Sequence, residues 1–347
     1  MKKHAIIPIF IPHLGCPNDC VFCNQRKITA RTEVPTAADV RQTAEDYLST
    51  LEDTGSHIEM SFYGGSFTGL PIDEQSAYLA IAKEYLDAGR IHGIHLSTRP
   101  DYINEEILDN LRTYGVGTIE LGVQSFDDEV LQKSNRGHTA KDVYEACELI
   151  KAYGFELGIQ LMIGLPGDSL ESCIYSAREA VRMQPSLARL YPTIVLEDTE
   201  LLEMYRRGEY VPLSRDEAVL RTKEMYRILD NAGIYIMRVG LKSNELIGEC
   251  GEINAGTYHP AFRQLVESAI ARDVLEPQLE KLSCDSPAER QLKVDVFCNS
   301  KWFSNVVGNG GENRRYFDEK FPDLDIRYKT DDELADGECV ARLHEKL

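Results

Sequence analysis

Three cysteines near the amino terminus carry the clearest chemistry in the sequence. Cys16, Cys20 and Cys23 are four and three residues apart, so their thiols can reach three corners of one metal centre. Thiolates are soft ligands that select zinc, copper(I) or iron–sulfur clusters. Structural zinc sites and [4Fe–4S] clusters both normally take four protein ligands. A loop with three thiols leaves one coordination position open, which favours chemistry over a purely structural role.

Two other interpretations of these thiols stay open on spacing alone. A zinc ion could take His13 or a distant residue as its fourth ligand, or two cysteines could form a disulfide. The chain has nine cysteines, an odd number, and most of them are scattered singly. Such usage is typical of a reducing compartment rather than of a disulfide framework. The sequence holds no second C-x2-C pair, so no auxiliary cluster is expected.

Elements that could position the thiols alternate regularly along the first half of the chain. Residues 6–11 are a continuous apolar run, typical of a strand buried on both faces, and the cysteine loop follows directly. Strands alternating with helices indicate βαβ units and a parallel sheet. We therefore predict an α/β fold, a partial TIM-like (β/α)6 barrel. Its strands are expected at residues 6–11, 58–63, 91–96, 117–122, 155–163 and 188–195.

Unusual residues follow each of the first five predicted strands. In barrels of this kind, functional residues gather at the carboxyl ends of the strands. Glycines such as Gly64 and Gly65 let a backbone approach a ligand closely, although a tight turn would use the same residues. Gln124 can donate and accept hydrogen bonds at once. The clusters are 16–23, 64–68, 97–101, 124–125 and 164–168.

The alternation of strands and helices loosens beyond residue 195. A strand is predicted at 234–239, and a later strand at 292–298 stands among helical patterns. We therefore expect two parts, a core barrel over residues 1–197 and a C-terminal α+β extension over residues 198–347. The extension is expected to cover the barrel mouth.

Composition limits the partners and the location of the protein. The 347 residues include 38 Lys and Arg against 57 Asp and Glu, a net charge of −19. Such a charge repels nucleic acid on average. The apolar run near the amino terminus is short and contains Pro8 and Pro12, unlike a signal peptide. No stretch approaches the roughly 18 apolar residues of a membrane span. We expect a cytoplasmic protein that does not span a membrane.

The cysteine loop resembles that of a known enzyme superfamily. A C-x3-C-x2-C motif with an aromatic residue, Phe22, before its last cysteine resembles the cluster loop of radical S-adenosylmethionine (SAM) enzymes. Residues 16–30 resemble the radical-SAM domain of the Elongator catalytic subunit and its stand-alone bacterial relatives. Oxygen-independent coproporphyrinogen oxidase is a more distant likeness. The resemblance implies a [4Fe–4S] cluster on Cys16, Cys20 and Cys23, whose fourth iron binds SAM.

The resemblance also implies which residues contact SAM on the second and third strands. Gly64 and Gly65 match a Gly-Gly-Glu-like stretch that binds the amino group of SAM through its backbone. Ser66 replaces the glutamate of that stretch, which leaves a backbone contact intact. Arg99 lies in a Ser-Thr-Arg-Pro-Asp-Tyr segment similar to the Elongator version.

Four further SAM contacts are implied on the fourth and fifth strands. Gln124 matches a glutamine that contacts SAM in the coproporphyrinogen oxidase family. Arg136 matches an arginine that binds the SAM carboxylate in that family. Gln160 stands in place of an aspartate at the ribose, and Met162 begins a stretch that lies along the adenine.

Taken as a member of this superfamily, the chain is expected to cleave SAM reductively to a 5′-deoxyadenosyl radical, which abstracts hydrogen from an unidentified substrate. A flavodoxin- or ferredoxin-like protein is the expected reductant. The Elongator likeness leaves tRNA modification open, although the net charge of −19 is unfavourable for it. A non-catalytic module, in which the metal only orders the loop or SAM is bound without cleavage, is the alternative from another class.

Overall fold

The structure is a computed structural model that describes residues 4–11, 16, 20–24, 33–51, 54–241, 257–284 and 291–344. The chain divides into two compact units, Met1–Tyr258 and His259–Leu347. None of the described helices is both long enough and apolar enough to cross a bilayer.

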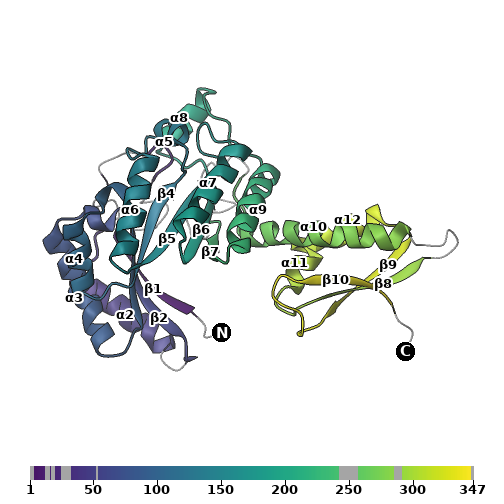
Figure 1. The fold of residues 1–347 in the computed structure, drawn as a ribbon, viewed down its shortest axis with the longest axis horizontal. Helices are drawn as coiled ribbons and strands as arrows, with labels where there is room; N and C mark the ends of the chain where they lie inside the picture. Colours follow the sequence, from purple (N-terminus) through teal and green to yellow (C-terminus); the bar gives the residue numbers. More distant parts are fainter. Residues whose placement is uncertain are drawn as a thin grey trace. The chain divides into compact units, whose positions relative to one another are not determined.

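The first unit is built on a seven-stranded sheet in which neighbouring strands follow chain order and run parallel (Figure 1). This confirms the α/β, partial-barrel prediction. A seventh strand joins the six that the alternation predicted. The strands are β1 (His4–Ile11), β2 (His57–Gly64), β3 (Gly93–Thr98), β4 (Thr118–Gln124), β5 (Glu156–Ile163), β6 (Leu187–Pro192) and β7 (Tyr235–Val239).

Helices connect these strands and cover one face of the sheet (Figure 1). Three of them begin with a capping box, in which the side chain of the N-cap residue and the side chain three residues later each accept from the other's backbone N–H. Each helix is thereby fixed at a definite residue. The helices are α2 (Ala37–Leu51), α3 (Ile72–Asp87), α4 (Glu105–Thr113), α5 (Asp128–Lys133), α6 (Ala140–Ala152), α7 (Leu170–Met183), α8 (Glu200–Arg206) and α9 (Arg215–Asn231). Short 3-10 turns, η2 (Phe67–Gly69) and η3 (Pro100–Tyr102), follow β2 and β3.

Alternate residues of each strand face opposite sides of the sheet. In β2, the side chains of Ile58, Met60 and Phe62 are fully or almost fully buried. Burying each of them stabilises the fold by roughly 1.5–3 kcal/mol. The intervening residues, Glu59 and Tyr63, are polar and lie on the other face. The helix-covered face therefore supplies the apolar core, and the opposite face is free to carry charged groups.

The second unit is an α+β arrangement, as predicted for the end of the chain. Its three-stranded sheet has the order β10–β8–β9, with β8 and β9 parallel and β10 antiparallel to β8. Apolar side chains of the long helix α10 pack on this sheet with those of the strands. The elements are α10 (Phe262–Cys284), β8 (Leu292–Cys298), α11 (Phe303–Val307), η4 (Asn309–Gly311), α12 (Glu312–Lys320), β9 (Leu324–Thr330) and β10 (Cys339–Leu343).

The division between the units falls at residue 258, whereas the sequence placed the end of the barrel at residue 197. The reason is β7, which pairs with β6 and so extends the same sheet. Residues 198–241 consequently lie in the first unit, with α8 and α9. That a later segment covers the mouth of the barrel stays a prediction.

Candidate functional site

The three-thiol loop begins where β1 ends. Cys20 is 7% exposed, while Cys16 and Cys23 are half-buried. The Cys23 N–H donates to the Cys20 carbonyl at 2.9 Å, which makes a turn between the second and third thiols. His13, the alternative fourth ligand for zinc, lies outside the described residues.

Backbone hydrogen bonds tie this loop to two distant parts of the chain. The Val21 N–H donates to the carbonyl of Ser134 at 3.1 Å, and the Val21 carbonyl accepts from the Leu201 N–H at 2.7 Å. Ser134 directly follows α5, and Leu201 lies in the first turn of α8. The loop is therefore held by segments that come more than 100 residues later in the sequence.

Arg136 is the side chain most directly joined to a thiol. Its Nη1 donates to the Cys20 sulfur at 3.2 Å, and its Nη2 donates to the Gly122 carbonyl at 2.6 Å. A Cβ at Gly122 would stand 3.2 Å from that Nη2 and 3.1 Å from Nε2 of Gln124. Glycine thus leaves the room that the guanidinium occupies at the end of β4. Whether Arg136 also binds the SAM carboxylate stays a prediction.

The Arg99 side chain contacts the backbone of Arg136 and is almost fully buried. Its Nη2 donates to the Arg136 carbonyl at 2.6 Å and to Asp101 at 2.8 Å. Its Nη1 is buried and has no hydrogen-bond partner among the described residues. Burial raises the pKa of the Cys16 thiol, while the charges of Arg136 and Arg99 act in the opposite direction. The two guanidinium groups thus favour the thiolate form that metal binding requires.

The Gly64-Gly65 turn packs directly against the end of β1. Gly64 has a φ of +122°, and a Cβ there would stand 2.4 Å from the Ile11 carbonyl oxygen. The Gly65 N–H donates to the same oxygen at 3.0 Å. Ser66 is fully buried, and its hydroxyl lies 2.8 Å from that of Thr98 and accepts from the Arg99 N–H at 3.2 Å. The Ser66 side chain therefore joins β2 to β3.

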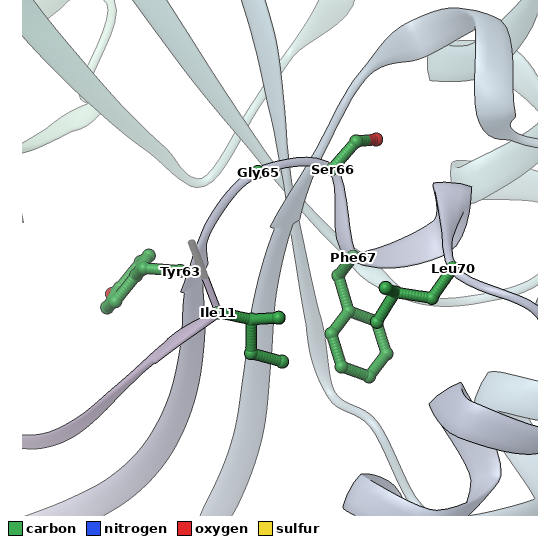
Figure 2. Close-up of a pocket in the computed structure, with 6 residues that line it drawn as sticks. All are labelled: Ile11, Tyr63, Gly65, Ser66, Phe67 and Leu70. Atoms are coloured by element: carbon green, nitrogen blue, oxygen red, sulfur yellow. The ribbon is translucent and has the colours of Figure 1, made fainter. Parts of the chain in front are cut away.

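A small apolar recess lies beside this turn, too narrow to hold a water molecule. Figure 2 shows the side chains of Ile11, Phe67 and Leu70 gathered on one side of the turn, with Tyr63 pointing to the other. The lining is mainly apolar. The polar side chains in this lining are those of Tyr63 and Ser66. That the backbone of Gly64 and Gly65 contacts SAM stays a prediction.

Gln124 and Gln160 meet at the ends of β4 and β5. The Gln160 Nε2 donates to the Gln124 Oε1 at 3.2 Å. Gln124 has a φ of +69°, beside a register shift between Gly122 and Gln124. A non-glycine residue in this region costs roughly 1–3 kcal/mol and often marks a functional site. Met162 lies two residues beyond Gln160, on the same face of β5, and is half-buried.

Hydrogen bonds join Cys20, Arg136 and Arg99, and a separate one joins Gln124 to Gln160. Gly64, Gly65 and Ser66 lie at the end of β2, and Met162 lies near the end of β5. The fit of a cluster and SAM to each of these residues individually stays a prediction. We call the predicted site residues together the cluster rim: Cys16, Cys20, Cys23, Gly64, Gly65, Ser66, Arg99, Gln124, Arg136, Gln160 and Met162.

His138 belongs to this neighbourhood, although sequence reasoning passed it over. It is buried, and its Nε2 lies 3.2 Å from the Val123 carbonyl oxygen. Burial, together with the charges of Arg136 and Arg99, lowers the pKa of His138 to about 4. The imidazole is therefore neutral at neutral pH. Only its position two residues after Arg136 could have pointed to it.

A second group that sequence reasoning missed lies further down the inner face of the sheet. Arg189 of β6 pairs with Glu120 of β4, Nε to Oε2, at 2.8 Å, and its Nη2 donates to the Tyr63 hydroxyl at 2.5 Å. The His95 Nε2 lies 3.6 Å from the same Glu120 oxygen. Burial is the main reason that the pKa of Tyr63 rises to about 12. A glutamate inside the apolar run of β4 was the available signal, because a fully buried charge is rare without a partner.

Comparison with known proteins places this fold and loop in a family. The model described as "Radical SAM superfamily" matches residues 10–180, and the one described as "Radical_SAM C-terminal domain" matches residues 185–272. The chain belongs to the radical SAM superfamily. Within that class its relatives are Elongator-like, as the loop residues indicated.

Two curated relatives and one solved structure illustrate the likeness. A protein of Methanocaldococcus infernus named tRNA uridine(34) acetyltransferase is 29% identical over 257 residues, which cover 62% of this chain and 48% of the relative. Elongator complex protein 3 of Dictyostelium discoideum is 31% identical over 194 residues, which cover 50% of this chain and 35% of the relative. This chain therefore spans about half or less of the length of these relatives.

The structure of Methanocaldococcus infernus Elp3 with an N-terminal deletion has a TM-score of 0.63 at 22% identity. The match covers 79% of this chain and 64% of that one. At this identity the likeness concerns the fold.

The cofactors of a radical SAM enzyme are a [4Fe–4S] cluster and SAM, and the cluster rim suits both. A cluster on thiolates is negatively charged, and the buried guanidinium groups of Arg136 and Arg99 lie beside the thiols to offset that charge. A hydrogen bond to a ligand sulfur, such as that of Arg136 to Cys20, also tunes the reduction potential of a cluster. The buried Arg99 Nη1 supplies a donor that no described residue uses.

Proposed function

We propose that this chain cleaves SAM reductively to methionine and a 5′-deoxyadenosyl radical, which abstracts hydrogen from a substrate. The observation that carries the proposal is the hydrogen bond from Arg136 to Cys20 at 3.2 Å, within a network that reaches Arg99, Gly122 and the Gly64-Gly65 turn. A purely structural metal site needs no such network of buried cations around one open coordination position.

The chain's own residues position and protect the reacting groups. Cys16, Cys20 and Cys23 would hold the cluster, which supplies one electron to the sulfonium when it is bound. The backbone carbonyls of Gly64 and Gly65 would accept from the ammonium group of SAM, while the Gly65 N–H donates to the Ile11 carbonyl. The paired amides of Gln124 and Gln160 can serve ribose hydroxyls.

Anaerobic reconstitution tests this proposal. The protein is loaded with iron and sulfide, reduced with dithionite and incubated with SAM, and 5′-deoxyadenosine and methionine are quantified. We expect both products in equal amounts. Cys20→Ala should abolish them, whereas Cys284→Ala, which removes an exposed thiol of the second unit, should not. Intact SAM beside a fully assembled cluster would favour the non-catalytic module.

Arg136→Lys gives a finer test of the network. Lysine keeps the charge but cannot donate to Cys20 and Gly122 at once, since the two bonds need the guanidinium fork. We expect about a tenfold slower cleavage of SAM, with the cluster still assembled. An unchanged rate would show that the arginine serves only the fold.

We further propose a uridine in tRNA as the substrate. The support is that relatives named tRNA uridine(34) acetyltransferase match 62% of this chain. The net charge of −19 requires that any contact with phosphates be local. Adding purified tRNA to the reduced enzyme should increase 5′-deoxyadenosine formation and change a nucleoside in the tRNA digest. Equal turnover with and without tRNA would turn the search to small-molecule or protein substrates.

A flavodoxin- or ferredoxin-like protein is the proposed reductant in place of dithionite. A low-potential electron must reach the three-thiol loop, and a one-electron carrier protein is the natural source. Reduced flavodoxin or ferredoxin should support SAM cleavage without dithionite, and failure of both carriers while dithionite works would exclude this class.

A further inference from the structure

Four of the eight histidines in the chain gather at the amino-terminal ends of β1, β2 and β3, opposite to the cluster rim. His4 and His57 are register partners on the parallel strands β1 and β2, and their rings stack with centroids 5.7 Å apart. The ring of His92, just before β3, lies 5.1 Å from that of His57. His95 lies on β3.

Glu59 lies among these imidazoles. Its Oε2 is 3.0 Å from the Nε2 of His4, and its Oε1 is 3.4 Å from the Nε2 of His57. One ligand atom from each of these three residues lies within 4.8 Å of the others. Atoms that bind one zinc ion at about 2.1 Å in a tetrahedral site are about 3.4 Å apart. The His57 contact has that separation and the His4 contact is shorter, and they use different oxygens of the Glu59 carboxylate.

From this geometry we propose that His4, His57 and Glu59 form a second metal site, which binds a divalent transition metal ion such as zinc. Two imidazoles and a carboxylate suit zinc, iron and nickel, and they are poor ligands for magnesium or calcium, which prefer oxygen alone. We call this site the amino-end site. It is distinct from the three-thiol loop and carries no thiol.

Further polar side chains lie beside the three proposed ligands of the amino-end site. Metal ligands are normally held in place by further polar groups. The Nδ1 of His95 lies 3.6 Å from the Glu59 Oε2, and its Nε2 lies 3.6 Å from Glu120, which in turn pairs with Arg189. Neither His95 nitrogen has a hydrogen bond of ordinary length among the described residues. A small shift of Glu59 toward His95 would supply one.

Access and charge also fit the proposal. The side chains of His4, His57 and Glu59 are 29%, 44% and 13% exposed, so an ion can enter from solvent. Three protein ligands leave a position for water, as in open zinc sites. One carboxylate and two neutral imidazoles leave a divalent ion with a net charge of +1 in a chain of net charge −19.

The amino-end site would fasten β1 to β2. In the described sheet β1 is an edge strand that pairs only with β2, and its far end leads into the three-thiol loop. A metal ion shared by His4, His57 and Glu59 would pin the near end of that strand. The expected role of the ion is therefore to stabilise the first unit, not to react with SAM.

Cobalt(II) is the probe for this proposal, because its absorption distinguishes thiolate from nitrogen and oxygen ligands. The protein with its cluster already assembled is titrated anaerobically with cobalt(II), and bound metal is counted after gel filtration. We expect one equivalent with no sulfur-to-cobalt charge-transfer band. His57→Ala and Glu59→Gln should each weaken binding at least tenfold. Glu156→Gln, which alters another glutamate at the start of a strand, should leave it unchanged.

Thermal unfolding and circular dichroism show whether a variant has lost metal binding only because it has lost its fold. Zinc should raise the unfolding temperature of the wild type and of Glu156→Gln, and it should leave those of His57→Ala and Glu59→Gln unchanged. Far-UV circular dichroism should show all four proteins folded without metal. Absence of cobalt binding, a thiolate band for all bound cobalt, or equal binding by the folded His57→Ala variant would overturn the proposal. SAM cleavage is measured separately, so its failure would bear on the cluster rim alone.

Discussion

The two ends of one parallel sheet carry two groups of polar residues that are built in different ways. At the carboxyl ends, the three thiols and the Gly64-Gly65-Ser66 turn of the cluster rim form short motifs where strands end and loops begin. At the amino ends, His4, His57 and Glu59 come from the strands themselves and meet only through the register of β1 and β2. The first group can be adjusted by changing a loop, whereas the second is fixed by the pairing of the sheet.

The ion pair of Glu120 and Arg189 lies between these two ends, and breaking it should have the largest effect. Glu120→Gln would leave the Arg189 guanidinium buried without a charged partner, a change that typically costs about 3–5 kcal/mol. We expect that loss in the free energy of unfolding, measured with urea. The double variant Glu120→Gln/Arg189→Met should recover part of it. If Glu120→Gln lowers the free energy of unfolding by less than about 1 kcal/mol, the Glu120–Arg189 pair does not couple the two ends of the sheet.

Gly64→Ala tests the cluster rim alone. The new Cβ would stand 2.4 Å from a backbone oxygen of Ile11 at a φ of +122°, so β1 and β2 must separate locally. We expect a loss of about 2–4 kcal/mol and a cluster that is easily lost. Gly154→Ala is the control, because Gly154 also has a positive φ but meets nothing within 4 Å. It should cost about 1 kcal/mol, and an equal cost at both positions would refute the close-packing argument.

Histidines at the two ends of the sheet should make the free energy of unfolding depend on pH in opposite directions. The pKa of His138 falls from an ordinary value near 6.5 to about 4, so the unfolded chain binds this proton more readily than the folded one. Its contribution to stability is full above pH 6.5 and is lost as the pH falls toward 4, by up to about 3 kcal/mol. His138→Gln should remove this loss. The measurement is urea unfolding at pH 7 and pH 5 for both proteins.

In the metal-free protein, His95 should make stability depend on pH in the opposite direction. Burial alone would lower the pKa of His95, but its interactions with Glu120 and Glu59 outweigh burial and raise it. Its contribution is therefore full below pH 6.5 and is lost as the pH rises through the higher pKa of the folded state. Replacing His95 by Gln should flatten the alkaline side of the stability profile and leave the acid side as in the wild type. If stability falls equally steeply with rising pH in the wild type and in His95→Gln, the proposed contrast between the two ends of the sheet is wrong.

The smallest effect is expected away from both ends. Arg41 and Glu84 form an ion pair on the helices α2 and α3, where both side chains are about half exposed. Exposed pairs contribute roughly 0–1 kcal/mol. Arg41→Gln should therefore leave the urea midpoint of unfolding and SAM cleavage unchanged within experimental error. A larger loss of stability would mean that the other variants are destabilised by removal of a charge as such, and not by the burial of its partner.

Sequence reasoning located the cluster rim because its residues come in short motifs. The spacing of Cys16, Cys20 and Cys23 and the Gly-Gly turn are visible without any knowledge of pairing, and the regular alternation predicted the parallel sheet. The amino-end residues carry no such signal. His4 and His57 are 53 positions apart, and only the register of β1 with β2 makes them neighbours.

The same limit explains most of the other differences. Residues 235–239 were recognised as a strand, but their place in the first sheet depends on pairing with β6. The strands β9 and β10 were not recognised. Residues 324–328 of β9 do alternate apolar and polar side chains, so that signal was missed, whereas β10 has no clear alternation and is defined by its pairing with β8. Arg189 was passed over because its partner Glu120 lies on another strand.

The hydrogen bonds that join the three-thiol loop to Ser134, Arg136 and Leu201 have a consequence for biosynthesis. A ribosome makes the three thiols first, and the groups that surround them follow only after more than 100 further residues. During that interval the thiols are in water, open to oxidants and to stray metals. Stable cluster insertion is therefore expected only after the chain has been made through at least Leu201.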